Sequence, residues 1–356
     1  MNPRITELQK QAAGRSDVIG LAGGLPADEL MPRTELARAL AEVTAHRDEA
    51  LQYGWPEGDE SLRAWIARRL TARGATVDPE RVIITSGAQQ ALALVGAACR
   101  GERISVGSET YPAAIAAFRQ AGAAVVVTGG DAAYVMPGVG NPHGVDQIEP
   151  HRLRWLAEKT LIVDEAYSEL RFDGQIARPL LADAPERVWH IGTFSKSVSP
   201  GLRVGWLIPP AREHDSIVDI KSAMDLQTAS LTQLAIRRLL ATLDYDALLA
   251  KARGFYQERA AVLGQALHDE VPGIRFTVPE GGFAIWIDTN DDGDDVALLE
   301  ACIAAGVCMD PSSVFRPRGA AGPVAMRACF SNTAPDQLVE GARRFATALE
   351  RWRRDR

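Results

Sequence analysis

Short apolar runs alternate with amphipathic, helix-like stretches through the middle of the chain. Runs of this length are typical of buried strands, and their alternation with helices predicts a mostly parallel sheet covered on both faces, an α/β fold. Ligands of such sheets bind at the carboxyl ends of the strands. The predicted strands are 81–85, 103–106, 124–128, 134–137, 160–164, 187–191 and 203–208, with helices over 88–99 and 113–122.

After Pro210 the pattern changes, and the chain becomes helical to about Leu267. Shorter strands and helices then alternate up to a final amphipathic helix, and Gly281 and Gly282 mark a turn between two of the strands. This part of the chain predicts a second, smaller α+β domain. Its predicted strands are 276–278, 283–287 and 324–330, and its predicted helices are 296–305 and 337–353.

Composition excludes several classes of protein. The chain has 356 residues, 46% of them hydrophobic, which is enough to bury a substantial core. A net charge of −7 argues against nucleic acid or an anionic membrane as a partner, because both select clustered positive charge. The chain lacks a long apolar stretch and the apolar core of a signal peptide, so we expect no membrane span and a cytoplasmic location. The four cysteines form no CxxC pair, so we expect no disulfide framework, and we predict no metal site.

Lys196 lies just past a predicted buried strand, where an uncompensated lysine is costly. One use for such a lysine is a Schiff base to an aldehyde cofactor, since desolvation lowers the pKa of the amine. Thr193, Ser195 and Arg203 could hold a phosphate beside it through hydroxyl and guanidinium contacts. By itself, the same segment could also be a solvated loop with ordinary serine and lysine residues.

Other motifs also have two interpretations when each is considered alone. The Ser86-Gly87-Ala88-Gln89 turn lies between a strand and a helix, where backbone N–H groups favour an anion, although it could simply cap the helix. Arg327 stands in an otherwise apolar strand and needs either a bound carboxylate or a buried acid. Tyr111 precedes a proline, as a loop anchor often does.

Taken together and in order, these motifs resemble the fold-type-I pyridoxal-phosphate (PLP) aminotransferases of class I and II. The resemblance covers nearly the whole chain and is closest to the branch of 2-aminoadipate aminotransferases and the aminotransferase domains of MocR-type regulators. It implies that Lys196 carries PLP as a Schiff base and moves a proton as general base and acid. It further implies a phosphate cup of Ser86, Gly87, Ala88, Gln89, Thr193, Ser195 and Arg203, a ring stacked on Tyr111, a phenolic oxygen bonded by Asn141 and Tyr167, and a pyridine nitrogen facing Asp164.

The resemblance also implies how substrate and a second subunit are bound. Arg327 would hold the substrate α-carboxylate together with Asn141, and Gly24 would belong to an N-terminal loop that closes over substrate. Tyr53 would reach the PLP phosphate of a neighbouring subunit, so a homodimer with shared active sites is expected. Glu165 follows Asp164 on a strand and should point to the opposite face. The expected division is an N-terminal segment at the active-site entrance and small domain (1–35), a large PLP-binding domain (36–245) and a small C-terminal domain (246–356).

The leading hypothesis is therefore an aminotransferase that acts on an L-amino acid and a 2-oxo acid. A first alternative keeps PLP but changes the reaction to that of a decarboxylase, β/γ-lyase, racemase or oxidative enzyme, which the cofactor motifs do not separate. A second is a ligand-sensing module, which we rank lower because the chain begins almost directly at the aminotransferase-like region. An NAD-binding enzyme would need a GxGxxG motif after an early strand, and the sequence has none. The candidates for substrate specificity are Arg4, Arg33, Phe315 and Arg316.

One segment departs from the family. Only residues 129–132 separate strand 124–128 from the next predicted strand, where the family places a helix. In the related fold these strands flank strand 103–106, so a parallel connection must return a strand length of about 17 Å and cross two spacings of about 9.6 Å in total. Four linking residues reach only about 17 Å, which is shorter than the diagonal distance that combines this return with this crossing. We therefore predict that 124–128 is not a regular parallel edge strand but displaced, shortened, antiparallel or irregular, with 103–106 nearer the edge.

Overall fold

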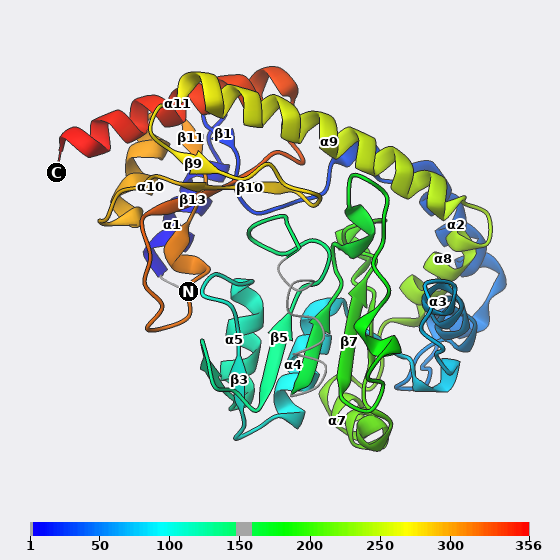
Figure 1. The fold of residues 1–356 in the computed structure, drawn as a ribbon. Helices are drawn as coiled ribbons and strands as arrows, with labels where there is room; N and C mark the ends of the chain where they lie inside the picture. Colours follow the sequence, from blue (N-terminus) through cyan, green and yellow to red (C-terminus); the bar gives the residue numbers. More distant parts are fainter. Residues whose placement is uncertain (1–2, 147–158, 356) are drawn as a thin grey trace.

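The computed structural model describes residues 3–146 and 159–355. Seven strands form the main sheet, and a four-stranded and a two-stranded sheet lie at the other end of the molecule (Figure 1). The long helix α9 (Tyr245–Glu270) runs from one part to the other, over the smaller sheets (Figure 1). This arrangement confirms the predicted α/β fold class.

The main sheet is parallel except for one strand. β8 is antiparallel to both of its neighbours, β2 and β7, and the remaining strands run parallel to one another. β5 and β7 are buried along their whole length, as expected when helices cover both faces of a sheet. Each predicted strand lies within two residues of an observed one. In sheet order the strands are β2 (Ile83–Thr85), β8 (Gly205–Ile208), β7 (Val188–Thr193), β6 (Thr160–Asp164), β5 (Ala132–Val135), β3 (Arg103–Ser105) and β4 (Ala124–Val126).

The helices begin and end at residues whose local chemistry explains their limits. Asp59 accepts a hydrogen bond from Leu62 N at the start of α3, and Asp244 does the same for Ala247 N at the start of α9. Gly122 ends α5 in the left-handed conformation at φ 96°. Among the described residues, the α-helices besides α9 are α1 (Pro3–Ala13), α2 (Arg33–His46), α3 (Glu60–Ala72), α4 (Ala88–Ala98), α5 (Pro112–Ala121), α7 (His214–Asp225), α8 (Ser230–Leu240), α10 (Asp295–Ala304) and α11 (Pro335–Arg354).

The smaller sheets bring the two ends of the chain together. The four-stranded sheet is antiparallel, with β13 between β12 and β10, and α9 packs against α11 beside it. The N-terminal strand β1 pairs in parallel with β11, so residues near the start of the chain lie against its last third. The strands are β1 (Ile19–Gly20), β9 (Arg275–Phe276), β10 (Ala284–Asp288), β11 (Val307–Cys308), β12 (Asp310–Pro311) and β13 (Ala325–Cys329).

The prediction for the edge of the main sheet was wrong in its main point. β4 is shortened to Ala124–Val126, but it pairs in parallel with β3 and forms the edge. The strands are staggered: β4 ends level with Ser105 of β3, while β5 begins level with Ile104. The connection therefore returns only about 3.3 Å while crossing about 9.6 Å, and five linking residues span this distance easily. The prediction assumed that the connection had to return a full strand length.

All four cysteines are buried and free. Burial raises the pKa of the Cys99 thiol to about 12. Within the described residues, no helix combines the length and the apolar character needed to cross a membrane.

The short connection depends on Gly130. A Cβ built there would lie 2.5 Å from Ser105 N and 2.8 Å from Arg103 O, both in the backbone of β3. We expect Gly130→Ala to lower the free energy of unfolding by about 1–3 kcal/mol, because neither backbone atom can move without disturbing the sheet. Gly254, an exposed helical glycine with open space around it, is the control, and Gly254→Ala should raise stability by up to about 1 kcal/mol. Urea unfolding measures both; equal effects would contradict this account of the crossover.

Candidate active site

A pocket of about 590 Å³ opens at the carboxyl ends of β5, β6 and β7. This is the edge of a parallel sheet where the sequence placed the ligand site. The pocket brings together most of the predicted cofactor residues, although they are far apart in the chain. It is lined by Ala88, Gln89, Tyr111, Met136, Asn141, Asp164, Ala166, Tyr167, Thr193, Ser195, Lys196, Pro200 and Arg203.

Lys196 follows β7 and points its amine into this pocket. Its Nζ donates to Gly24 O at 3.2 Å and lies 5.3 Å from the ring centre of Tyr167. Burial lowers the pKa of the Lys196 amine, because the charged form loses its hydration. A buried amine with a lowered pKa is a nucleophile toward carbonyl carbon.

Asp164 ends β6 and is buried, with two donors compensating for the lost water. The Tyr134 hydroxyl donates to Oδ2 at 2.8 Å, and Ala166 N donates to Oδ1 at 3.0 Å. Burial raises the pKa of the Asp164 carboxyl, and these two donors oppose that rise by stabilising the anion. Sequence reasoning missed Tyr134. Its signal was a hydroxyl group inside an otherwise apolar strand beside β6.

The turn between β2 and α4 forms one wall of the pocket with Arg203. Gly87 has φ 77°, a conformation that favours glycine, and a Cβ there would displace the Arg203 guanidinium, whose Nη2 would lie 2.6 Å away. Arg203 Nη2 donates to Ser86 O at 3.1 Å, and the Thr193 hydroxyl donates to Ser195 Oγ at 2.9 Å. A guanidinium, hydroxyl groups and the first N–H groups of α4 therefore converge, and together they can bind an anion.

An ion pair on α7, between a buried lysine and an aspartate, supports the turn between β2 and α4. Lys221 has no exposed surface, and its Nζ donates to Asp225 Oδ1 at 2.8 Å. Asp225 Oδ2 in turn accepts from Gln90 Nε2 at 2.7 Å and from Ser86 Oγ at 3.3 Å. Burial lowers the pKa of Lys221, and the carboxylate opposes this shift. Sequence reasoning missed this pair, because its effect on Ser86 exists only once α7 packs beside α4.

Arg327 on β13 has a buried acid as its partner. Its Nε and Nη2 donate to Asp310 Oδ2 at 3.1 and 2.7 Å, and its Nη1 donates to Asn141 Oδ1 at 2.8 Å. Of the two alternatives that the sequence left open for this arginine, the structure supplies the acid. Asp310 was not predicted; its signal was a single acidic residue in the apolar segment before Pro311. The Phe315 ring lies 4.7 Å from the guanidinium.

Gly24 lies over this part of the site. A Cβ built at Gly24 would be 3.7 Å from Arg327 Nη2 and 3.8 Å from the Tyr167 hydroxyl. Its carbonyl accepts from Lys196, as described above. The N-terminal loop therefore contacts both the predicted nucleophile and the predicted carboxylate-binding arginine.

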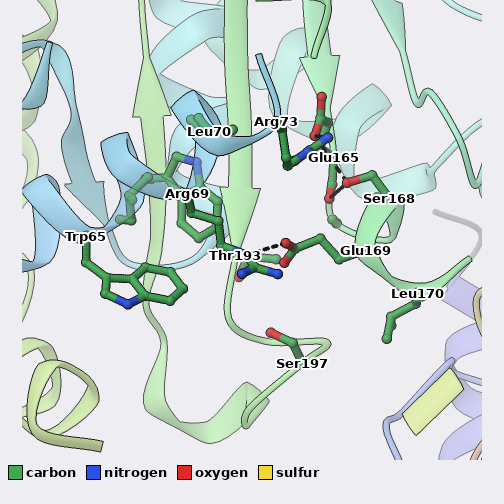
Figure 2. Close-up of a pocket in the computed structure, with 13 residues that line it drawn as sticks. Trp65, Arg69, Leu70, Arg73, Glu165, Ser168, Glu169, Leu170, Thr193 and Ser197 are labelled. Atoms are coloured by element: carbon green, nitrogen blue, oxygen red, sulfur yellow. Dashed lines mark hydrogen bonds and ion pairs between the residues drawn. The ribbon is translucent and has the colours of Figure 1, made fainter. Parts of the chain in front are cut away.

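Glu165 lies on the other side of the strand end from Asp164, as predicted. Figure 2 shows a second, smaller pocket between α3 and the sheet, where Glu165 pairs with Arg73 at 2.6 Å. Arg69 pairs with Glu169 in the same place (Figure 2). Thr193 lines both pockets, so it forms part of the wall between them.

Other predicted residues lie outside the main pocket. Tyr53 is 78% exposed on the surface. Arg4 pairs with Glu300 and Arg33 with Asp28, both on exposed surface, while Arg316 donates to Glu109 at 3.1 Å. Among residues 3–146 and 159–355, no group of His, Cys, Asp or Glu side chains is arranged to hold a metal ion.

Comparison with known proteins identifies the family. Residues 16–131 and 135–345 match the family Aminotransferase class I and II. The chain is 32% identical to 2-aminoadipate transaminase of Thermus thermophilus, over 94% of this chain and 91% of that protein. It is 31% identical to aromatic-amino-acid aminotransferase 1 of Thermococcus litoralis, over 94% of this chain and 88% of that protein. The crystal structure of the α-aminoadipate aminotransferase LysN from Thermus thermophilus, complexed with N-(5'-phosphopyridoxyl)-L-leucine, superimposes with a TM-score of 0.89 at 30% identity, covering 99% of this chain and 96% of that one.

The chain belongs to the class I and II aminotransferases. It is a PLP-dependent aminotransferase of fold type I, as the motifs predicted. The interruption of the family match at 132–134 follows directly after the short connection between β4 and β5.

The hydrogen bond from Tyr134 to Asp164 leads to a prediction. We expect Tyr134→Phe to weaken PLP retention about tenfold, because the donor that stabilises the Asp164 carboxylate is lost. Tyr245→Phe is the matched control: its buried hydroxyl bonds Ser197 Oγ at 2.8 Å and does not reach Asp164. PLP release, followed by absorbance after dilution, measures both variants. Equal losses would show that the hydroxyl acts only through general stability.

Proposed function

We propose that this aminotransferase uses Lys196 to carry PLP and moves an amino group between an L-amino acid and a 2-oxo acid. The observation that carries the assignment is the buried Lys196 amine, with its lowered pKa, in one pocket with Asp164 and Arg203. Lys196 is also placed to remove and return a proton at the substrate α-carbon, as general base and acid.

The pocket fits PLP, whose pyridine ring acts as an electron sink when its nitrogen is protonated. We assign the pyridine nitrogen to Asp164, because its carboxyl lies in this pocket and two donors favour its anionic form. We assign the phenolic oxygen to Asn141 and Tyr167, and the ring face to Tyr111. The anion site at the start of α4 would hold the phosphate, through Ser86, Gly87, Ala88, Gln89, Thr193, Ser195 and Arg203.

The substrate would bind next to Gly24, with its α-carboxylate on Arg327 and Asn141. The contact between Arg327 Nη1 and Asn141 supports this assignment, because both side chains line one small pocket with Gly24 and Tyr167. The relatives named for 2-aminoadipate and for aromatic amino acids suggest the first donors to test. We also propose that residues 1–35, 36–245 and 246–356 are the entrance segment, the large domain and the small domain, with the last boundary at the start of α9.

We further propose a homodimer in which Tyr53 completes the partner's phosphate site. Tyr53 is one of several large apolar side chains that are exposed in two segments of the chain. Gly54 N donates to Gln227, and Ser230 Oγ donates to Gln52 O at 3.1 Å, so the segments around Tyr53 and around the end of α7 are adjacent. A second copy would cover this patch, which is made of Leu51, Tyr53, Trp55, Met224 and Leu226, with exposed fractions of 49–80%.

The function is tested with a panel of amino donors against 2-oxoglutarate and pyruvate, with product identification. We expect amino acid and 2-oxo acid products from the wild type and no turnover by Lys196→Ala, because no other assigned group replaces the amine. Borohydride treatment of the wild type should leave the cofactor attached to the Lys196 peptide in a mass spectrum. A label on another peptide would refute the assignment of Lys196, and a decarboxylated or racemised product would identify a different PLP reaction.

The dimer gives a separate prediction. Trp55→Glu should shift the protein from dimer to monomer in sedimentation, because it buries a charge in the apolar patch. Tyr53→Phe should leave the dimer intact but weaken PLP retention about tenfold, since it removes one hydrogen bond to an anion. A wild type that sediments as a fully active monomer would contradict the proposal.

A further inference from the structure

Asp310 is a buried acid that bonds Arg327 in the proposed active site. Its carboxylate is 6% exposed, and Oδ2 accepts from both Nε and Nη2 of Arg327, which is 8% exposed. Arg327 is the residue to which the proposed function assigns the substrate α-carboxylate. The guanidinium therefore has a carboxylate partner within the protein.

The partner is held firmly in place. Asp310 Oδ2 also accepts from Gly23 N at 3.1 Å, and Oδ1 accepts from Gln9 Nε2 at 2.8 Å. Each oxygen thus has a donor from the N-terminal segment, and Oδ2 also accepts from Arg327. Turning the carboxylate away would break several contacts at once, so Asp310 stays with Arg327 whether or not substrate is bound.

The contacts leave one edge of the guanidinium for a ligand. The edge formed by Nε and Nη2 faces Asp310, and Nη1 donates to Asn141. The two Nη atoms lie 3.7 and 3.9 Å from the position of a Cβ on Gly24, so their outer edge faces the loop above Lys196. An α-carboxylate can still bind there, but it adds a second anion to an arginine that is already neutralised.

This pairing changes the cost of binding a donor that lacks the carboxylate. A site that depends on a substrate group to satisfy its buried polar atoms rejects the analogue without that group by about 10⁴-fold or more, because those atoms are left unpaired. Here Arg327 keeps a partner when the subsite is empty. The penalty that would exclude a simple amine is therefore largely absent.

We propose that Asp310 is the resident counter-ion of Arg327 and determines how this enzyme discriminates between amino donors with and without an α-carboxylate, so that primary amines serve as donors beside L-amino acids. This inference rests on the proposed function. In the overall step, R–CH2–NH2 and R′–CO–COOH give R–CHO and R′–CH(NH2)–COOH. The donor carbon loses its NH2 group and one hydrogen and takes an oxygen from water; the acceptor is reduced to the amino acid, and its keto oxygen leaves as water.

Asp310→Asn is the informative variant, because asparagine keeps an acceptor oxygen near Arg327 and Gly23 while removing the charge. The measured quantity is the ratio of kcat/KM for 2-phenylethylamine to that for L-phenylalanine, each with 2-oxoglutarate. In the wild type we expect this ratio to be no lower than about 10⁻², and in Asp310→Asn it should fall at least about tenfold. Asp295→Asn is the matched control, since Asp295 is another buried carboxylate that bonds Ser312 Oγ at 2.8 Å and does not contact Arg327.

Binding provides a readout that does not depend on turnover. Calorimetry with 3-phenylpropionate, an unreactive carboxylate, should show about tenfold tighter binding to Asp310→Asn than to the wild type or Asp295→Asn, because Arg327 is no longer neutralised. A merely structural role for Asp310 would lower both kcat/KM values together and would not tighten this binding.

The outcomes separate the two proposals. If no donor of any kind reacts, the proposed function fails. If amino acids react but the wild type discriminates against the amine by more than about 10⁴-fold, the role of Asp310 is refuted without any variant. An unchanged ratio and unchanged 3-phenylpropionate binding in Asp310→Asn would also refute it.

Discussion

Charged side chains are costly to bury unless the protein supplies partners, and this constraint organises the active site. Asp164 is stabilised by the Tyr134 hydroxyl and a backbone N–H, and Arg327 by Asp310 and Asn141. Neighbouring strands and loops complete the hydrogen bonds of both charged side chains. The main sheet positions Asp164 and the four-stranded sheet positions Arg327, and their hydrogen-bond partners come from neighbouring strands and loops.

The same contacts connect parts of the chain that are distant in sequence. Asp310 on β12 bonds Arg327 on β13, Gly23 in the N-terminal loop and Gln9 on α1. Gly24 then accepts from Lys196 at the end of β7. The smaller sheet, the N-terminal segment and the main sheet therefore meet at the side of the pocket where we propose that substrate binds. A change in one of these contacts affects both the arginine and the loop above the lysine.

Much of the fold followed from pattern, and most of the residues that the motifs predict for the cofactor lie in one pocket. The strands of the main sheet were found to within two residues, because strands buried on both faces appear as apolar runs. The edge around β4 was misjudged, since the stagger of β3, β4 and β5 leaves no trace in hydropathy. Tyr134, Asp310 and the Lys221–Asp225 pair were missed for a related reason: each acts on a residue that lies in another segment.

The sequence by itself determined the class of fold and the family, and it supplied the residues that we propose for the chemistry, because periodicity and motif are local properties of the chain. Only the tertiary structure decided which group compensates each buried charge and how the short crossover spans the sheet edge. Arg327 shows the difference. Its place in an apolar strand demands a partner, but pairing between β12 and β13 selects Asp310. Hydrogen bonds and ion pairs act over a few ångströms, and which atoms come that close is set by the packing of the whole chain.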